Sequence, residues 1–171
     1  MKRDIEWVEG AKPLNDALTA NGVFLVAVDA KGKPNPMTIG WGQIGIVWSR
    51  PMFTVLVRTS RYTYECLQSS DSFTINVPPR GGLKDELALC GTKSGRDLDK
   101  AAECGLTMVP GKAVETPVID ECALHYECRI VARTQQERED FRSNEVLGQF
   151  YAKGDHHLVV FGEIVAAYAS D

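Results

Sequence analysis

The segment that decides the fold reads Leu124-His125-Tyr126-Glu127-Cys128-Arg129-Ile130-Val131-Ala132. Leu, Tyr, Cys, Ile and Ala alternate here with His, Glu and Arg, and only Val131 departs from a period of two. This alternation predicts a strand with one buried face and one solvated face, as an antiparallel sheet allows. His125 falls on the polar face, so we expect a surface residue without a role.

Strand-length apolar runs recur through the rest of the chain. Each run is bounded by Gly, Pro, Asn, Asp or Ser, which is typical of a mainly β protein. The runs are Val23–Val28, Ile44–Trp48, Met52–Val57 and Phe73–Val77. Asp29–Pro34 reads as a hairpin loop in which Gly32 can take a positive φ.

The predicted helices are short and peripheral. They cover Lys12–Ala20, Tyr62–Ser69, Leu83–Leu89 and Ser94–Glu103. In the last, Ser94 is the expected cap and Gly105 the stop. The polar run Gln135–Asp140 is expected to be an exposed loop or short helix.

Composition narrows the class of protein. The 171 residues, 44% of them hydrophobic, fit one domain spanning 1–171. The formal charge of -4 is spread without a basic block, so nucleic acid is not expected as a partner. No apolar run approaches the roughly 20 residues of a membrane span, and the N-terminus is charged, so no membrane association and a cytoplasmic protein are expected.

The cysteine pattern favours free thiols. Five cysteines are an odd number, and a chain of this length can form a core without disulfides. Cys122 and Cys128 lack the spacing of a zinc site, and no second pair completes four ligands, so no metal is expected.

Two segments carry residues suited to ligand binding. In the first, Asn35–Gly45, three glycines interrupt a strand, which indicates bulges or close approach of another molecule. Backbone N–H groups there could bond a planar heteroaromatic ligand while Trp41 covers it. The alternative is a barrel corner with Trp41 in the core.

The second segment, Arg58–Glu65, joins a strand end to a helix start. Two guanidiniums, several hydroxyls and free helix N–H groups are typical of a phosphate site. The alternative is a pair of ordinary surface arginines. Thr38 and Arg58 are expected on neighbouring strands, so that one ligand could contact both segments.

The motifs, taken in order, resemble the flavin-reductase-like FMN-binding family, and within it the flavoredoxins. They are Asn35-x-Met37-Thr38, Ser49-Arg50-Pro51, Arg58-x-x-Arg61-Tyr62-Thr63, Phe73-Thr74-Ile75-Asn76-Val77, the segment from Cys90 to Lys100, and Gly154-Asp155-His156-His157 through Ile164. The resemblance runs from about Leu14 to Ala167. The polar stretch Gln135–Gly148 looks longer than in compact members.

The resemblance implies a split β-barrel, antiparallel with Greek-key character and short peripheral helices, that forms a homodimer with FMN near the interface. It also implies roles for particular residues. The isoalloxazine and ribityl chain would lie against Met37, Thr38, Ile39, Gly40 and Trp41. The phosphate would be held by Arg58, Ser60, Arg61, Tyr62 and Thr63, and further contacts would come from Asn76, Lys93 and Ser94. His156 matches a family histidine at the nicotinamide or flavin edge, although a hydrogen-bonded turn histidine is the alternative.

The implied function is an NAD(P)H:flavin oxidoreductase or flavoredoxin-type electron transfer to a small-molecule or protein acceptor. No GxGxxG fingerprint is present, so NAD(P)H would bind transiently against the flavin. Hydrolase and NTPase motifs are also missing from the sequence. The main alternative is an FMN-binding carrier or redox sensor without pyridine-nucleotide turnover. A pyridoxamine-phosphate-oxidase-like enzyme fits the ordered motifs less well.

Overall fold

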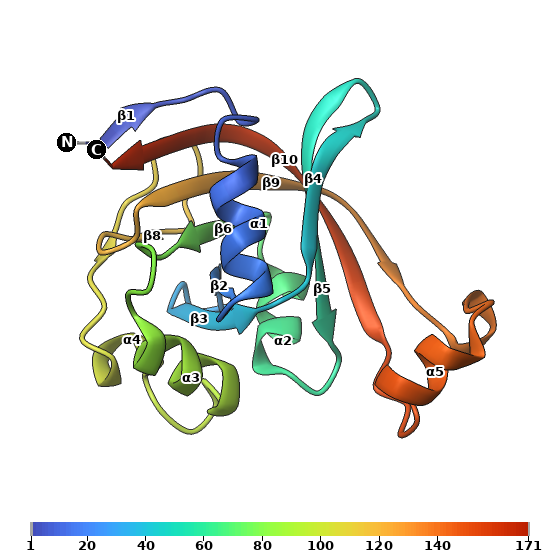
Figure 1. The fold of residues 1–171 in the computed structure, drawn as a ribbon. Helices are drawn as coiled ribbons and strands as arrows, with labels where there is room; N and C mark the ends of the chain where they lie inside the picture. The colour runs from blue at the N-terminus through green and yellow to red at the C-terminus, as the bar shows by residue number, and fades with distance from the viewer. Residues whose placement is uncertain (1, 171) are drawn as a thin grey trace.

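One antiparallel sheet of eight strands organises the chain (Figure 1). The computed structural model describes residues 2–170. The strands follow the order β3-β2-β6-β9-β10-β5-β4, and β1 pairs with β10, so both ends of the described chain lie in the same sheet. The strands are β1 (Lys2–Asp4), β2 (Val23–Val28), β3 (Pro34–Ile39), β4 (Gly42–Val47), β5 (Arg50–Arg58), β6 (Ser72–Val77), β9 (Leu124–Gln135) and β10 (His157–Ser170).

The sheet curls around an apolar interior but does not close, because β3 and β4 end the strand order without pairing. This is a split barrel, and the predicted fold class is confirmed. The β2 strand matches its predicted bounds, and the other long strands match within a few residues. Trp48, predicted as the end of a strand, instead lies in the β4–β5 turn with φ 52°.

The helices are short and lie around the barrel, as predicted. They are α1 (Ala11–Thr19), α2 (Tyr62–Ser69), α3 (Lys84–Thr92), α4 (Lys100–Glu103) and α5 (Asn144–Phe150), with a 3-10 turn η1 at Arg138–Asp140. The prediction of a helix over Ser94–Glu103 was wrong in its first half, because the helix begins only at Lys100. Asp99, not Ser94, caps α4 by accepting from the Ala102 N–H at 3.1 Å, and Gly105 ends it with φ 63°.

Part of the outer face of the barrel is buried by other segments of the chain. The two-stranded sheet of β7 (Met108–Val109) and β8 (Val118–Ile119) and helix α3 bury a second apolar cluster against the outward side chains of β2. The prediction of a solvated face on β9 is therefore wrong for its first half. His125 and Glu127 are fully buried, and the two ring nitrogens of His125 lie 2.9 Å from Asn76 Oδ1 and 3.0 Å from the Cys122 carbonyl.

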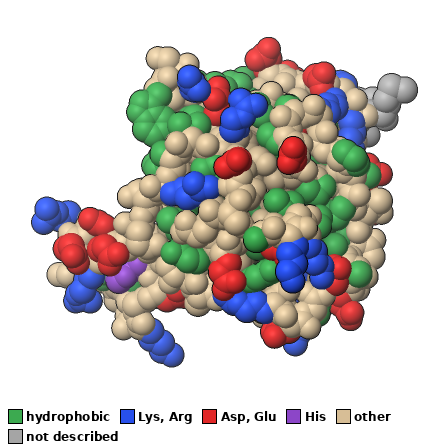
Figure 2. Space-filling model, turned by 180° about the vertical axis from the view of Figure 1, so that it is seen from behind, with side chains coloured by type: hydrophobic (Ala, Val, Ile, Leu, Met, Phe, Trp, Pro, Cys, Tyr) green, Lys and Arg blue, Asp and Glu red, His purple; other side chains and the backbone are tan. Residues whose placement is uncertain are grey.

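Two projections leave the barrel (Figure 1). One is the β4–β5 hairpin. The other, which we call the arm, is the segment 136–156 with η1 and α5, joined to the ends of β9 and β10. On the face shown in Figure 2, acidic and basic side chains are intermixed, and charged groups gather on the arm.

Candidate flavin-binding site

Two adjoining pockets open at the gap in the barrel, and Met37, Arg58 and Arg61 line both of them. The polar pocket has a volume of about 200 Å³. The Trp41 pocket, of about 240 Å³, lies between β3, the start of β4, β5 and the start of β10. The pockets unite most of the residues that the sequence singled out. The prediction that Thr38 and Arg58 lie on neighbouring strands is wrong, because β3 and β5 are far apart in the strand order. The curl of the sheet nevertheless brings both residues to one pocket.

The polar pocket is strongly cationic. Its wall combines the β5–α2 turn with the segment after α3, and among residues 2–170 its one acidic lining residue is Asp155. The five cations are Arg58, Arg61, Lys93, Arg96 and Lys100. Ser60, Tyr62, Thr63 and Ser94 add hydroxyls. No side chain caps the start of α2, although the Tyr64 N–H donates to the Arg61 carbonyl at 3.0 Å. Such a donor set fits a phosphate.

Lys100 is a cation of this pocket that sequence reasoning missed. Its side chain is buried, and its Nζ donates to the Cys90 carbonyl at 3.2 Å without a carboxylate partner. Burial lowers the pKa of Lys100. A buried ammonium without a counter-ion is costly, and an anionic ligand would relieve that cost. The sequence alone carried little signal for this role, because lysine side chains are rarely buried.

Arg58 and Asp155 tie the arm to this site. The Arg58 guanidinium donates to the carbonyls of Asp155 and Phe150, both at 2.9 Å. The Asp155 carboxylate accepts from the Ser60 N–H and hydroxyl and from the Thr59 hydroxyl at 2.7 to 3.0 Å. Burial alone would raise the pKa of Asp155, but these hydrogen bonds outweigh it and lower the pKa. Ser60 is thus occupied by a carboxylate of the chain itself.

Trp41 forms one edge of its pocket and is 40% exposed, so the alternative of a core indole is wrong. The centroid of its ring lies 5.0 Å from that of Phe150, in an edge-on arrangement, and 5.3 Å from that of His157. The Thr38 hydroxyl is engaged, because it donates to the Leu87 carbonyl at 2.6 Å. Gly40 is exposed beside Trp41, which leaves its backbone open to a ligand.

The structure brings His157, not His156, to the pocket. His156 lines neither pocket, packs against Tyr151 and Phe141, and has a buried Nε2 without a partner. His157 lines the Trp41 pocket, and its Nδ1 lies 2.7 Å from the Tyr151 hydroxyl. Burial, and next the positive charge of Arg58, lower the pKa of His157 to about 4. Because the two histidines are adjacent in sequence, sequence reasoning could not tell which of them lines the pocket.

Asn76 is the other predicted site residue that lies elsewhere. Its side chain is fully buried on the outer face of the barrel, where it accepts from the Ile119 N–H and contacts His125. The alternation of β6 directs Asn76 to the same side as Phe24, with which it pairs, and so away from both pockets.

The fold and the paired pockets define a split barrel with a site for an extended anionic ligand. Residues 17–171 match the model of the flavin reductase like domain. An uncharacterized protein of Archaeoglobus fulgidus is 31% identical over 161 residues, covering 94% of this chain and 75% of the relative. The chain belongs to the flavin reductase like family.

Solved structures similar to this chain support the same family. The flavoredoxin of Methanosarcina acetivorans superposes with a TM-score of 0.66 at 31% identity, covering 88% of this chain and 69% of that one. The flavoredoxin of Desulfovibrio vulgaris gives a TM-score of 0.68 at 26% identity, covering 88% and 70%. Among residues 2–170, no helix is long and apolar enough to cross a membrane.

Proposed function

We propose that the two pockets hold one FMN molecule, with its phosphate in the polar pocket and its ring system in the Trp41 pocket. The observation that carries this proposal is the cationic lining of the polar pocket, with five cations against one carboxylate, directly beside an exposed indole. Flavoredoxins are similar to this chain along most of its length, which supports the same assignment.

The phosphate contacts follow from which donors are free. Arg61, Lys93 and Lys100 supply charge, while Thr63, Ser94 and the uncapped N-terminus of α2 supply hydrogen bonds. Tyr62 contributes mainly by packing, because its hydroxyl donates to Asp29 at 3.1 Å. Arg58 and Ser60 act more through Asp155, by holding the arm beside the pocket. Met37, Thr38, Ile39, Gly40 and Trp41 form the ring side.

We propose a flavin-dependent redox function, either NAD(P)H:flavin oxidoreductase or flavoredoxin-type electron transfer. Bound FMN supplies hydride acceptance and onward transfer of one or two electrons. The chain's own residues bind and orient: Trp41 and Phe150 exclude water from one edge, and Tyr151 holds the imidazole of His157 by Nδ1, leaving Nε2 for the pocket. We propose His157 in place of His156 as the histidine at the flavin edge.

A titration tests FMN binding. Wild-type protein is titrated with FMN and with riboflavin, which lacks the phosphate, and the Lys100→Met variant is compared with it. We expect tighter binding of FMN than of riboflavin, and a loss of that preference in Lys100→Met, which replaces the ammonium with an unbranched, uncharged side chain one atom shorter. Equal affinity of the wild type for both ligands would contradict the phosphate assignment.

The alternative, an FMN-binding carrier or sensor, has the same site. Oxidation of NADH and NADPH with added FMN distinguishes the two: an oxidoreductase turns over many times, whereas a carrier reduces its flavin at most once and slowly.

A further inference from the structure

Cys90 and Cys104 form a thiol pair beside the polar pocket. Their Sγ atoms lie 4.0 Å apart, between the last turn of α3 and the end of α4, two helices that lie side by side in Figure 1. Cys90 is buried and lines the pocket. Cys104 is partly exposed. The remaining cysteines, Cys66, Cys122 and Cys128, are buried.

The segment that joins the two cysteines forms a wall of the pocket. It contains six lining residues, which are Thr92, Lys93, Ser94, Gly95, Arg96 and Lys100. Lys100 also contacts the cysteine backbone directly, because its Nζ donates to the Cys90 carbonyl. A covalent link between the two cysteines would therefore close a loop that carries three of the five pocket cations.

The Sγ atoms of Cys90 and Cys104 are already close to bonding distance. A disulfide needs an S–S distance of about 2 Å, so the two sulfurs must approach by roughly 2 Å. Cys104 follows a helix of only four residues and precedes Gly105, which has φ 63° and open space around it. Rotation of the Cys104 side chain and a shift of α4 would bring the two sulfurs closer.

We propose that Cys90 and Cys104 form a reversible disulfide that restrains this wall and weakens phosphate binding. With a small disulfide RSSR as oxidant, the partly exposed Cys104 thiolate attacks one sulfur and releases RS⁻, giving a mixed disulfide. The Cys90 thiolate then attacks the Cys104 sulfur and releases the second RS⁻. Two electrons pass to the oxidant, and the two thiol protons end on the released thiols.

The reaction should be slow at neutral pH. Burial raises the pKa of Cys90 to about 12 and also raises that of Cys104, so few thiolates form. The Lys100 ammonium acts in the opposite direction on both. Oxidation is therefore best followed at about pH 8.5, where more thiolate is present.

Mass spectrometry tests the disulfide without any flavin. Reduced protein is incubated with oxidised glutathione, alkylated and digested with trypsin. We expect the chain to lose two hydrogens and the peptides 85–93 and 101–112 to be joined, with full reversal by dithiothreitol. Glutathione attached to Cys104 without a joined peptide, or a link between any other cysteines, would overturn the proposal.

Variants assign the order of the steps. Cys90→Ala should stop at the mixed disulfide on Cys104, and Cys104→Ser should take up no glutathione at the pair. Cys66→Ser is the matched control, a buried thiol on α2 whose loss should leave the joined peptide unchanged. If a variant fails to fold, the peptide map of the wild type still decides.

The effect on the pocket rests on the proposed function and is measured separately. We expect oxidation to weaken FMN binding by about fivefold or more, because the shift of α4 that brings the sulfurs together moves Lys100, the first residue of α4, relative to the Cys90 carbonyl and the pocket. Riboflavin affinity should change less. Equal FMN affinity of the oxidised and reduced proteins would overturn the coupling. Failure of the reduced protein to bind FMN would instead contradict the proposed function.

Discussion

Arg61 lines both pockets, and its guanidinium donates to the Gly91 carbonyl at 3.2 Å, so it remains available for further contacts. We expect Arg61→Ala to weaken FMN binding by about 1.5–3 kcal/mol, the range of a charge-assisted hydrogen bond. Riboflavin should bind almost as before. Titration of both ligands measures this, with Arg50→Ala as the control, since Arg50 pairs with Glu163 away from the pockets. An equal loss for both ligands would remove Arg61 from the phosphate site.

Trp41 is a second residue whose role can be measured. Because its side chain is partly exposed at the pocket edge, Trp41→Phe should leave the melting temperature of the FMN-free protein almost unchanged. FMN affinity or the flavin spectrum should change, and the quenching of tryptophan fluorescence by FMN should decrease. A destabilised variant with unchanged flavin affinity and spectrum would show that Trp41 acts only in packing.

Two buried histidines make stability depend on pH. Burial lowers the pKa of both His125 and His157 to about 4. The unfolded chain binds protons near pH 6.5, so the folded state, which keeps these rings neutral, loses stability as the pH falls from about 6.5 towards 4. Each histidine contributes up to about 1.4 kcal/mol per pH unit in that window and nothing more below it.

Urea unfolding at about pH 7, 6 and 5 measures this slope. We expect a flatter slope in His125→Asn, and a still flatter one when His157→Asn is added. A slope that stays the same in the double variant would mean that other groups cause the acid sensitivity.

At the scale of elements, β10 depends on a glycine at its centre. Gly162 lies between β5 and β9, where the register shifts, and a Cβ there would lie 2.5 Å from the Phe73 ring and 2.8 Å from Cys128 Cβ. Gly162→Ala should therefore lower the free energy of unfolding by about 1–3 kcal/mol, as overpacking does. Gly45→Ala is the control, because nothing lies within 4 Å of its Cβ position. Similar urea midpoints for the two variants would contradict the close contact at Gly162.

The elements themselves were largely predictable. Strand β2 and helix α2 match their predicted bounds because their signals are local: a continuous apolar run in one case, and polar residues after a strand in the other. The first half of β9 was misread because its outer face is covered by residues that lie elsewhere in the chain. No period within β9 itself carries that information.

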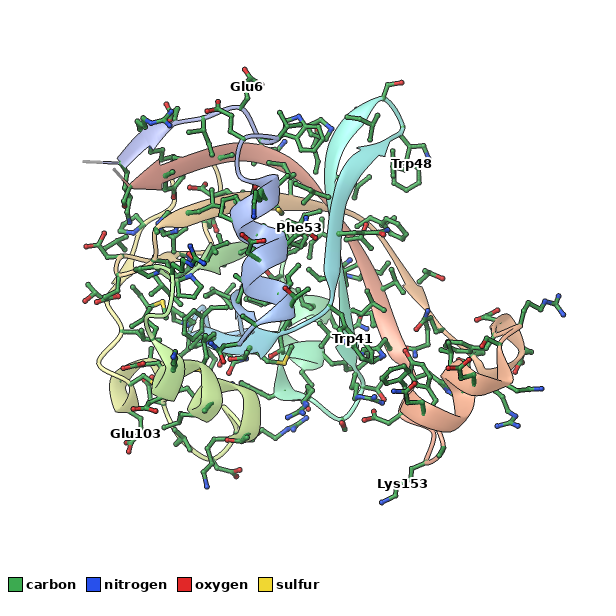
Figure 3. All side chains as sticks on the ribbon, viewed as in Figure 1. Glu6, Trp41, Trp48, Phe53, Glu103 and Lys153 are labelled. Atoms are coloured by element: carbon green, nitrogen blue, oxygen red, sulfur yellow. The ribbon has the colours of Figure 1, made fainter. Side chains whose placement is uncertain are left out.

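At the scale of the whole molecule, the β4–β5 hairpin presents apolar side chains to solvent. Ile46 is 62% exposed and Trp48 58%, and Trp48 points outward near the hairpin tip (Figure 3). A hydrophobic group marks the same projection in Figure 2. We propose that this hairpin contributes to a symmetric homodimer, as the family resemblance implies.

Sedimentation should then give twice the chain mass, and Ile46→Glu with Trp48→Glu should give a folded monomer. Val8→Glu, which places the same charge at another exposed apolar position, should remain dimeric. A flavin-loaded monomer of the wild type at low micromolar concentration would refute the interface.

The sequence by itself determined the strands, the family and the two segments that line the pockets, since strand periods, turn residues and helix starts depend on neighbours along the chain. Only the tertiary structure decided which face of β9 is buried, that Asn76 points away from the site, and that His157 rather than His156 reaches it. It also brought Lys100 and the Cys90–Cys104 pair to the polar pocket. The physical reason is the same in each case: burial and contact depend on segments distant in sequence, which meet only when the sheet curls and its outer face is covered.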